Sequence, residues 1–145
     1  MHFDNNKMTY NKNNDKSLDK FSHSLGQNWY HIVLIPKKRY AVFQWPQIKE
    51  TAELAFAYVC KKHNISIFTK EIMDDHVHLF VNCPPEFSVR KLLQILKGGT
   101  SHFIRNKHPS LKRYISFWNK GGMYRSLGSV SAGVVKKYIE RQDWH

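Results

Sequence analysis

The sequence predicts an α+β fold, in which a four-stranded antiparallel sheet carries two helices on one face and a further helix follows at the C-terminal end. Segments of strand-like and helix-like pattern follow one another in the order β-α-β-β-α-β-α. The second and third strand-like segments are joined closely enough for a hairpin. At 145 residues and 41% hydrophobic content, the chain suits one domain with its own core.

The first half of the chain provides a strand and a helix. Residues 29–35 are aromatic and β-branched, and Pro36 with the basic turn 37–39 ends the run. After Pro46, apolar residues recur at helical spacing through 47–62, which predicts an amphipathic helix. Residues 1–27 are rich in Asn, Lys, Asp and Ser and have no period, so we predict a mobile N-terminal tail and a domain over 28–145.

The middle of the chain predicts a hairpin and a second helix. Residues 65–73 form the second strand, Asp74 and Asp75 make the turn, and 76–82 form the third strand. Ser88 can cap a helix over 88–106. The pair Gly98-Gly99 weakens that helix, so it indicates either close packing or a backbone that approaches a ligand.

The last third predicts a short strand over 122–127 and a helix over 131–142 that Ser131 caps. Between them and the second helix, 107–121 is a basic and aromatic connection. Its rings are those of Tyr114, Phe117 and Trp118, and we expect at least two of the three in the core rather than stacked on bases. The order β-α-β-β-α-β is the split βαβ, ferredoxin-like arrangement, which puts strands one and three at the centre of the sheet.

Positive charge is concentrated at the C-terminal end. The chain has a formal net charge of +12, and residues 90–145 carry twelve Lys and Arg against Glu140 and Asp143. A positive charge excess of this size, confined to one part of the chain, indicates a polyanionic binding partner, and nucleic acid is the leading candidate. Anionic membrane is disfavoured, because no stretch is both basic and strongly amphipathic.

Other classes of protein are disfavoured by the same reading. No apolar run reaches the length of a membrane span, and the N-terminus lacks an apolar signal region. Cys60 and Cys83 are isolated and fit no zinc spacing, so they read as reduced thiols of a cytoplasmic protein.

The segment 76–78, His-Val-His, is a candidate metal site. Side chains two apart on a strand share a face, so His76 and His78 lie about 7 Å apart along it. Two neutral imidazoles on a rigid strand can hold one divalent cation. By itself the pair is weak evidence, because the chain contains nine histidines.

The last helix carries a second candidate group. Tyr138 and Gln142 are four residues apart and share a face, with Lys137 and Arg141 beside them. An aromatic ring there is usually core, yet a phenol among cations also suits a nucleophile held near a phosphate.

Together these segments resemble the single-strand DNA transposases of the insertion-sequence 200/605 group, HUH-type enzymes with a tyrosine nucleophile. Residues 73–79 (Met-Asp-Asp-His-Val-His-Leu) are similar to the family's His-hydrophobic-His motif, and 136–142 (Lys-Lys-Tyr-Ile-Glu-Arg-Gln) to its tyrosine helix. Residues 30–33 and 96–98 also match, so the resemblance covers roughly 28–144.

The resemblance implies a metal-dependent enzyme that nicks and joins DNA. His76, His78 and Gln142 would hold Mg²⁺ or Mn²⁺, and Tyr138 would attack the phosphorus to leave a 5′-phosphotyrosine and a free 3′-OH. A cation must favour the phenolate of a tyrosine, whether the metal, Lys137 or Arg141.

The resemblance also implies partners. They are single-stranded DNA with subterminal hairpins and a second copy of the chain, in a homodimer whose tyrosine helix acts in cis or in trans. The candidate phosphate contacts are Lys97, Arg105, Lys107, Lys112, Arg113, Arg125, Lys137 and Arg141.

Several alternatives stay open. A domesticated, repeat-associated tyrosine transposase would share the chemistry but differ in target and assembly. A replication-initiator or relaxase nuclease also pairs His with Tyr, although Tyr138 lies unusually near the C-terminus for one. A non-enzymatic ferredoxin-like nucleic-acid-binding module would display aromatics where this chain has His76 and His78. A scaffold role would leave the concentrated charge unexplained.

Overall fold

A computed structural model describes residues 28–113, 116–121, 123–128 and 132–141. The predicted tail 1–27, as well as Tyr114 and Gln142, lies outside the described residues.

Four antiparallel strands form one sheet: β1 (Asn28–Leu34), β2 (Ser66–Ile72), β3 (Val77–Cys83) and β4 (Met123–Gly128). Their order across the sheet is β2-β3-β1-β4, so the first and third strands are central, as predicted. The connection between β2 and β3 is the predicted hairpin. In its turn the Met73 N–H donates a hydrogen bond to the His76 carbonyl at 2.8 Å.

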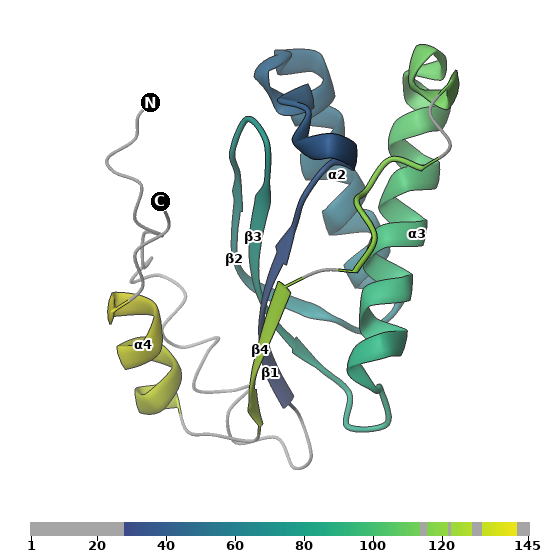
Figure 1. Ribbon diagram of the computed structural model, residues 1–145. Coiled ribbons are helices and arrows are strands. Elements are labelled where there is room, and N and C mark those ends of the chain that lie inside the picture. Colours follow the sequence, from purple (N-terminus) through teal and green to yellow (C-terminus); the bar gives the residue numbers. More distant parts are fainter. Residues whose placement is uncertain (1–27, 114–115, 122, 129–131, 142–145) are drawn as a thin grey trace.

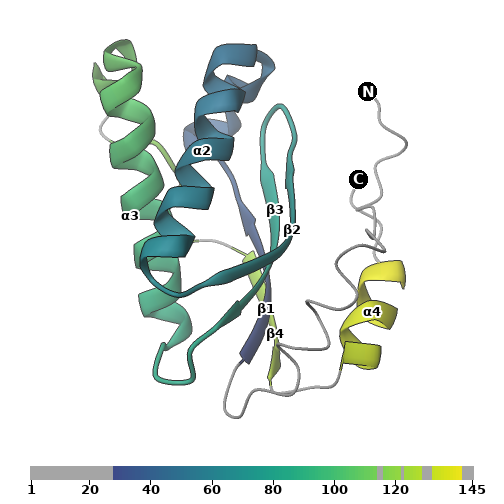
Figure 2. The ribbon, with the colours of Figure 1, turned by 180° about the vertical axis from the view of Figure 1, so that it is seen from behind.

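Helices α2 (Pro46–Lys62) and α3 (Val89–Lys107) cover one face of the sheet, while α4 (Ala132–Arg141) lies on the opposite side (Figures 1 and 2). The Ser88 hydroxyl accepts the Lys91 N–H at 3.0 Å, which confirms the predicted cap of α3. The predicted bounds of α2 and α3 are each within one residue of the observed ones.

The main core lies between the sheet and the helices α2 and α3. Alternation along β1 and β3 directs Ile32, Leu34 and the odd-numbered apolar residues of β3 toward the helices. The helices contribute Ala52, Ala55, Phe56, Leu92, Leu96 and Ile104. Phe117 and Trp118 are also buried there, as predicted for the aromatic connection.

The structure gives a packing reason for Gly99 but not for Gly98. A Cβ built at Gly99 would lie 2.8 Å from Val59 Cγ2, so α2 and α3 pack too closely there for a side chain. At Gly98 the same atom would meet nothing within 4 Å. Close packing of the helices is therefore the reason for Gly99.

The α4 side of the sheet has a smaller aromatic cluster. Trp29, Phe68 and Phe80 are each at most 5% exposed, and the Trp29 ring centroid lies 6.2 Å from that of Phe68 and 6.0 Å from that of Phe80. Phe80 of this cluster also packs against the rings of His31 and Tyr138.

Candidate active site on the α4 side of the sheet

His76 and His78 come together at the start of β3. His76 directly precedes the strand and His78 is its second residue, and both rings are on the α4 side. Their centroids lie 4.8 Å apart with the ring planes nearly perpendicular. His78 is only 8% exposed, so surrounding side chains fix the position of its ring.

Asp75 orients His76. His76 Nδ1 donates to Asp75 Oδ1 at 2.7 Å, and Arg39 Nε donates to the other carboxylate oxygen at 3.0 Å. Burial alone would raise the pKa of Asp75, but the hydrogen bonds from His76 and Arg39 outweigh it and lower the pKa. Because the carboxylate accepts the Nδ1 proton, the lone pair of neutral His76 is on Nε2, where a cation binds.

His31 of β1 links the histidine pair to the tyrosine. Its Nε2 lies 3.4 Å from His78 Nδ1, and its Nδ1 lies 2.9 Å from the hydroxyl oxygen of Tyr138. Its ring stacks on Phe80, with centroids 6.0 Å apart and planes 13° apart. Burial, assisted by the nearby Arg125, lowers the pKa of His31 to about 4. Neutral His31 can therefore accept a hydrogen bond from the phenol at Nδ1 while Nε2 faces His78.

His31 is a site residue that could not be identified from the sequence, although residues 30–33 belong to the family resemblance. Period-two alternation assigns His31 and His78 each to one face of its own strand. The missing information was the register: His31 pairs with Phe80 and Val33 with His78, which brings the two imidazoles together. That register depends on residues far apart in the chain.

Tyr138 projects from α4 onto this row of imidazoles. Its ring centroid lies 5.4 Å from that of Phe80, and the Arg125 guanidinium carbon lies 6.0 Å from the ring centre. Burial raises the pKa of Tyr138, and Arg125 opposes that rise without cancelling it. The phenol is thus protonated near neutral pH, and an additional positive charge or a proton acceptor has to favour its phenolate.

A hollow beside Tyr138 gives a ligand access to the hydroxyl. It encloses about 190 Å³ and is lined by His31, Val33, Met123, Tyr124, Arg125 and Tyr138. The Arg125 guanidinium suits an anionic ligand there. A phosphodiester that enters the hollow would meet a cation and a hydroxyl together.

The residues suit a divalent metal in part. Two same-face imidazoles, one of them held by a carboxylate, are a common partial ligand set. Among the described residues, no group of three His, Cys, Asp or Glu side chains could hold a metal ion. Gln142, the third ligand that the sequence analysis proposes, is outside the described residues.

Six of the eight predicted phosphate contacts are exposed. Arg125 lies at the hollow, and Lys137 and Arg141 are exposed on α4. Lys107, Lys112 and Arg113 are exposed at the end of α3 and in the 3-10 helix η5 (Pro109–Arg113).

Lys97 and Arg105 instead have internal partners. The Lys97 ammonium donates to the backbone carbonyls of Asn119 and Gly121, and burial lowers its pKa. Arg105 donates to the Lys112 carbonyl at 3.3 Å. Both side chains therefore tie the connection after α3 to that helix.

Comparison with known proteins gives a consistent result. A family model described as "Transposase IS200 like" matches residues 24–142. The transposase for insertion sequence element IS200 of Salmonella typhimurium is 29% identical over 131 residues, which is 88% of this chain and 83% of the relative. The ISDra2 transposase TnpA of Deinococcus radiodurans is 23% identical over 116 residues, covering 78% of this chain and 82% of the relative.

Solved structures share the fold. A Deinococcus radiodurans R1 protein, solved by crystallography as a candidate transposase, superposes with a TM-score of 0.65 at 19% identity, over 85% of this chain and 96% of that one. A tyrosine transposase associated with REP sequences, solved bound to a REP hairpin, gives a TM-score of 0.51 at 13% identity, over 79% and 63% of the two chains. Among the described residues, no helix is both long and apolar enough to cross a membrane.

Proposed function

Because the chain belongs to the family of IS200-like transposases, we propose that it nicks and rejoins single-stranded DNA through a phosphotyrosine intermediate on Tyr138. The observation that supports this most is the continuous row of His76, His78, His31 and Tyr138 on one side of the sheet. A phenol held by an imidazole beside a cation-lined hollow has the parts that nucleophilic attack on a phosphodiester needs.

The proposed step conserves the phosphoester. Tyr138 Oη forms a bond to phosphorus, the bond from phosphorus to the 3′ oxygen breaks, and that oxygen leaves as a free 3′-OH after taking up a proton. The phenol proton passes to solvent, while the Nδ1 of His31, which is within hydrogen-bond distance, orients the hydroxyl. A 3′-OH from the same or another strand then reverses the step and joins DNA without an added energy source.

Each neighbour of Tyr138 has a distinct part in this scheme. His31 fixes the direction of the hydroxyl, and Phe80 limits the positions that the tyrosine ring can take. Arg125 attracts the phosphate and stabilises charge that develops on its oxygens. Arg125 also favours the phenolate, because it already opposes the effect of burial on the Tyr138 pKa.

His76 and His78, with Gln142 as a third ligand, would hold Mg²⁺ or Mn²⁺. When bound, such a cation polarises the scissile phosphate. Asp75 would keep His76 oriented for metal binding, since its hydrogen bond fixes the His76 tautomer.

The proposed substrate is single-stranded DNA that carries hairpins near the ends of the mobile element. The structural neighbour solved with a REP hairpin supports a hairpin ligand. The exposed cations of α4 and of the segment after α3 would contact its phosphates. We also propose a homodimer, with the tyrosine helix placed either in the site of its own chain or in that of its partner.

The test is covalent capture. The protein is incubated with labelled single-stranded DNA from the ends of the element that encodes it, with EDTA, Mg²⁺ or Mn²⁺, and a denaturing gel is examined for a protein–DNA band. We expect a metal-dependent band that Tyr138→Phe and His76→Ala both abolish. Two matched variants serve as controls: Tyr124→Phe removes the other phenol of the same hollow, and His102→Ala removes an exposed histidine of α3.

Retention of the band in Tyr138→Phe together with its loss in Tyr124→Phe would assign the nucleophile to Tyr124. Salt-sensitive binding of the correct DNA end without any covalent band would favour a non-enzymatic binding module.

A further inference from the structure

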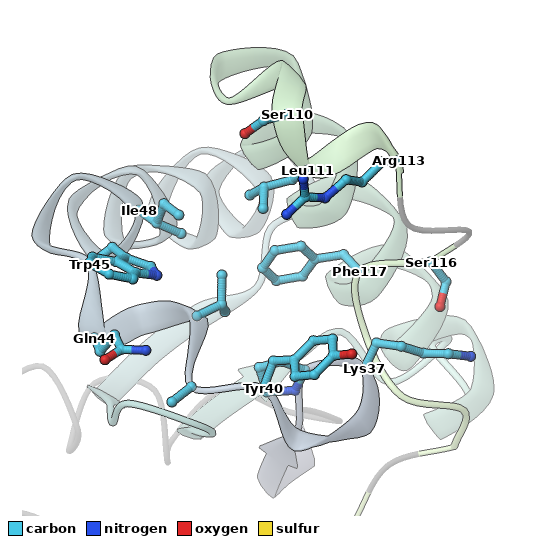
Figure 3. Close-up of a pocket in the computed structure, with 13 residues that line it drawn as sticks. Lys37, Tyr40, Gln44, Trp45, Ile48, Ser110, Leu111, Arg113, Ser116 and Phe117 are labelled. Atoms are coloured by element: carbon cyan, nitrogen blue, oxygen red, sulfur yellow. The ribbon is translucent and has the colours of Figure 1, made fainter.

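A second cavity lies beyond the C-terminal end of β1, between that end, the start of α2 and η5 (Figure 3). It encloses about 380 Å³. Its walls come from the segment 36–48, which includes the 3-10 helices η3 (Lys37–Arg39) and η4 (Val42–Gln44), and from a second set of residues: Ser110, Leu111, Arg113, Ser116 and Phe117. None of its lining residues is shared with the hollow beside Tyr138.

Three aromatic side chains line this cavity. Figure 3 shows the Phe117 ring near its centre, Trp45 and Ile48 on one side, and Tyr40 below. Phe117 is 6% exposed and belongs to the core, whereas Tyr40 is 46% and Trp45 56% exposed. Large exposed rings around a cavity leave apolar surface in water, so a flat apolar ligand would be stabilised there.

The cavity walls are fixed to the sheet. The Lys37 N–H donates to the Phe117 carbonyl at 2.9 Å, and the Asn119 N–H donates to the Ile35 carbonyl at 2.8 Å. The Phe43 N–H donates to the Asp74 carbonyl at 3.0 Å, which holds η4 against the turn before His76. These bonds therefore hold the backbone of the cavity walls in place.

The same segment also contacts the candidate active site. Arg39 immediately precedes Tyr40 and donates to Asp75, and Asp75 accepts the Nδ1 proton of His76. One side of the segment 36–48 thus lines the cavity while the other supports a proposed metal ligand.

Charge around the cavity suits a nucleic acid. Arg113 lies above the Phe117 ring in Figure 3, and Lys37 is at the rim with its ammonium directed away from the rings. Lys38 and Lys112 are exposed next to these residues in the chain. None of the described residues that line the cavity is acidic. Rings inside and cations at the rim match a base attached to its phosphate backbone.

We propose that this cavity binds one unpaired base of the single-stranded DNA substrate, stacked on Trp45 or Tyr40, with an adjacent phosphate contacted by Arg113. The inference rests on the proposed function, because it assigns an additional contact to the same DNA. Stacking on one aromatic side chain contributes to affinity by about 10-fold or more.

The test combines photocrosslinking with affinity measurements. The full-length protein is bound to single-stranded oligothymidylate in which 5-iododeoxyuridine replaces one thymidine, irradiated, digested and analysed by mass spectrometry. We expect a crosslink on Tyr40 or Trp45, and a Trp45→Ala protein that loses the Trp45 crosslink and binds oligothymidylate about 10-fold more weakly. Tyr58→Ala is the matched control, since Tyr58 is also 56% exposed on α2 but does not line the cavity.

A second probe separates base stacking from phosphate binding. An abasic oligonucleotide of the same length retains every phosphate but has no bases. Wild type and Tyr58→Ala should prefer oligothymidylate to the abasic strand, and Trp45→Ala should lose about 10-fold of that preference. Thermal unfolding of the three proteins should agree within a few degrees, which shows that the change is in binding.

Trp45→Ala with wild-type affinity and crosslinks only outside 36–48 and 110–117 would overturn the inference. If wild type still forms the covalent band on Tyr138, the proposed function stands and only the cavity assignment fails. If wild type neither binds single-stranded DNA nor forms the band, both fail together.

Discussion

Replacing His31 by alanine tests the residue that connects the two halves of the candidate site. The change removes the partner of the Tyr138 hydroxyl, a 2.9 Å contact, and the ring stacked on Phe80. A partly buried polar group left without its partner costs about 1–3 kcal/mol. Each 1.36 kcal/mol corresponds to about a tenfold change in rate, so covalent-band formation should slow by about 5- to 150-fold.

The assay is single-turnover formation of the covalent band with protein in excess over labelled DNA. DNA affinity should stay within about twofold of wild type, because His31 acts on the nucleophile and the exposed cations bind the phosphates. His31→Gln keeps a hydrogen-bonding group and should recover part of the rate, whereas His102→Ala should behave as wild type. A His31→Ala protein that is folded and reacts within twofold of the wild-type rate would refute the role given to His31.

Three further predictions follow from other parts of the molecule. Gly99→Ala should destabilise the fold by about 1–3 kcal/mol, because its Cβ would meet Val59 at 2.8 Å. Gly98→Ala should be neutral or stabilising by up to about 1 kcal/mol. Urea unfolding compares the two variants, and equal stabilities would contradict the packing of α2 on α3. Burial raises the pKa of Cys60 to about 12 and of Cys83 to about 11, so their thiolates at pH 8 should be about 100- to 1,000-fold scarcer than at the ordinary value of 9.0. Alkylation at pH 8 should therefore require unfolding, and rapid reaction of the native protein would contradict their burial. Since Tyr138 contacts His31 of its own chain, mixing Tyr138→Phe with His76→Ala subunits should not restore activity, and recovery on mixing would show that the tyrosine acts on the partner's site.

Local pattern was sufficient for most of the fold. Alternation along β1 and β3 separated Ile32 and Leu79 from His31 and His78, and helical spacing found α2 and α3. The order of elements then gave the sheet topology, because the split βαβ arrangement fixes which strands are central.

The site could be predicted only where its residues are close in sequence. His76 and His78 share a face by period alone, whereas His31 required the register between β1 and β3. The internal role of Lys97 could not be predicted either, because its partners are backbone carbonyls of Asn119 and Gly121 in an irregular segment. The cavity around Trp45 depends on two 3-10 helices, which have no period long enough to detect.

The most direct test of the central claim is the identity of the residue that becomes linked to DNA. The covalent adduct formed with element-end DNA and Mg²⁺ or Mn²⁺ would be treated with nuclease and trypsin, and the peptides sequenced by mass spectrometry. Trypsin cleaves after Lys137 and Arg141, so the account predicts a nucleotide-modified peptide of residues 138–141 carrying the mass on Tyr138. A modified residue elsewhere, such as Tyr124, would contradict the account.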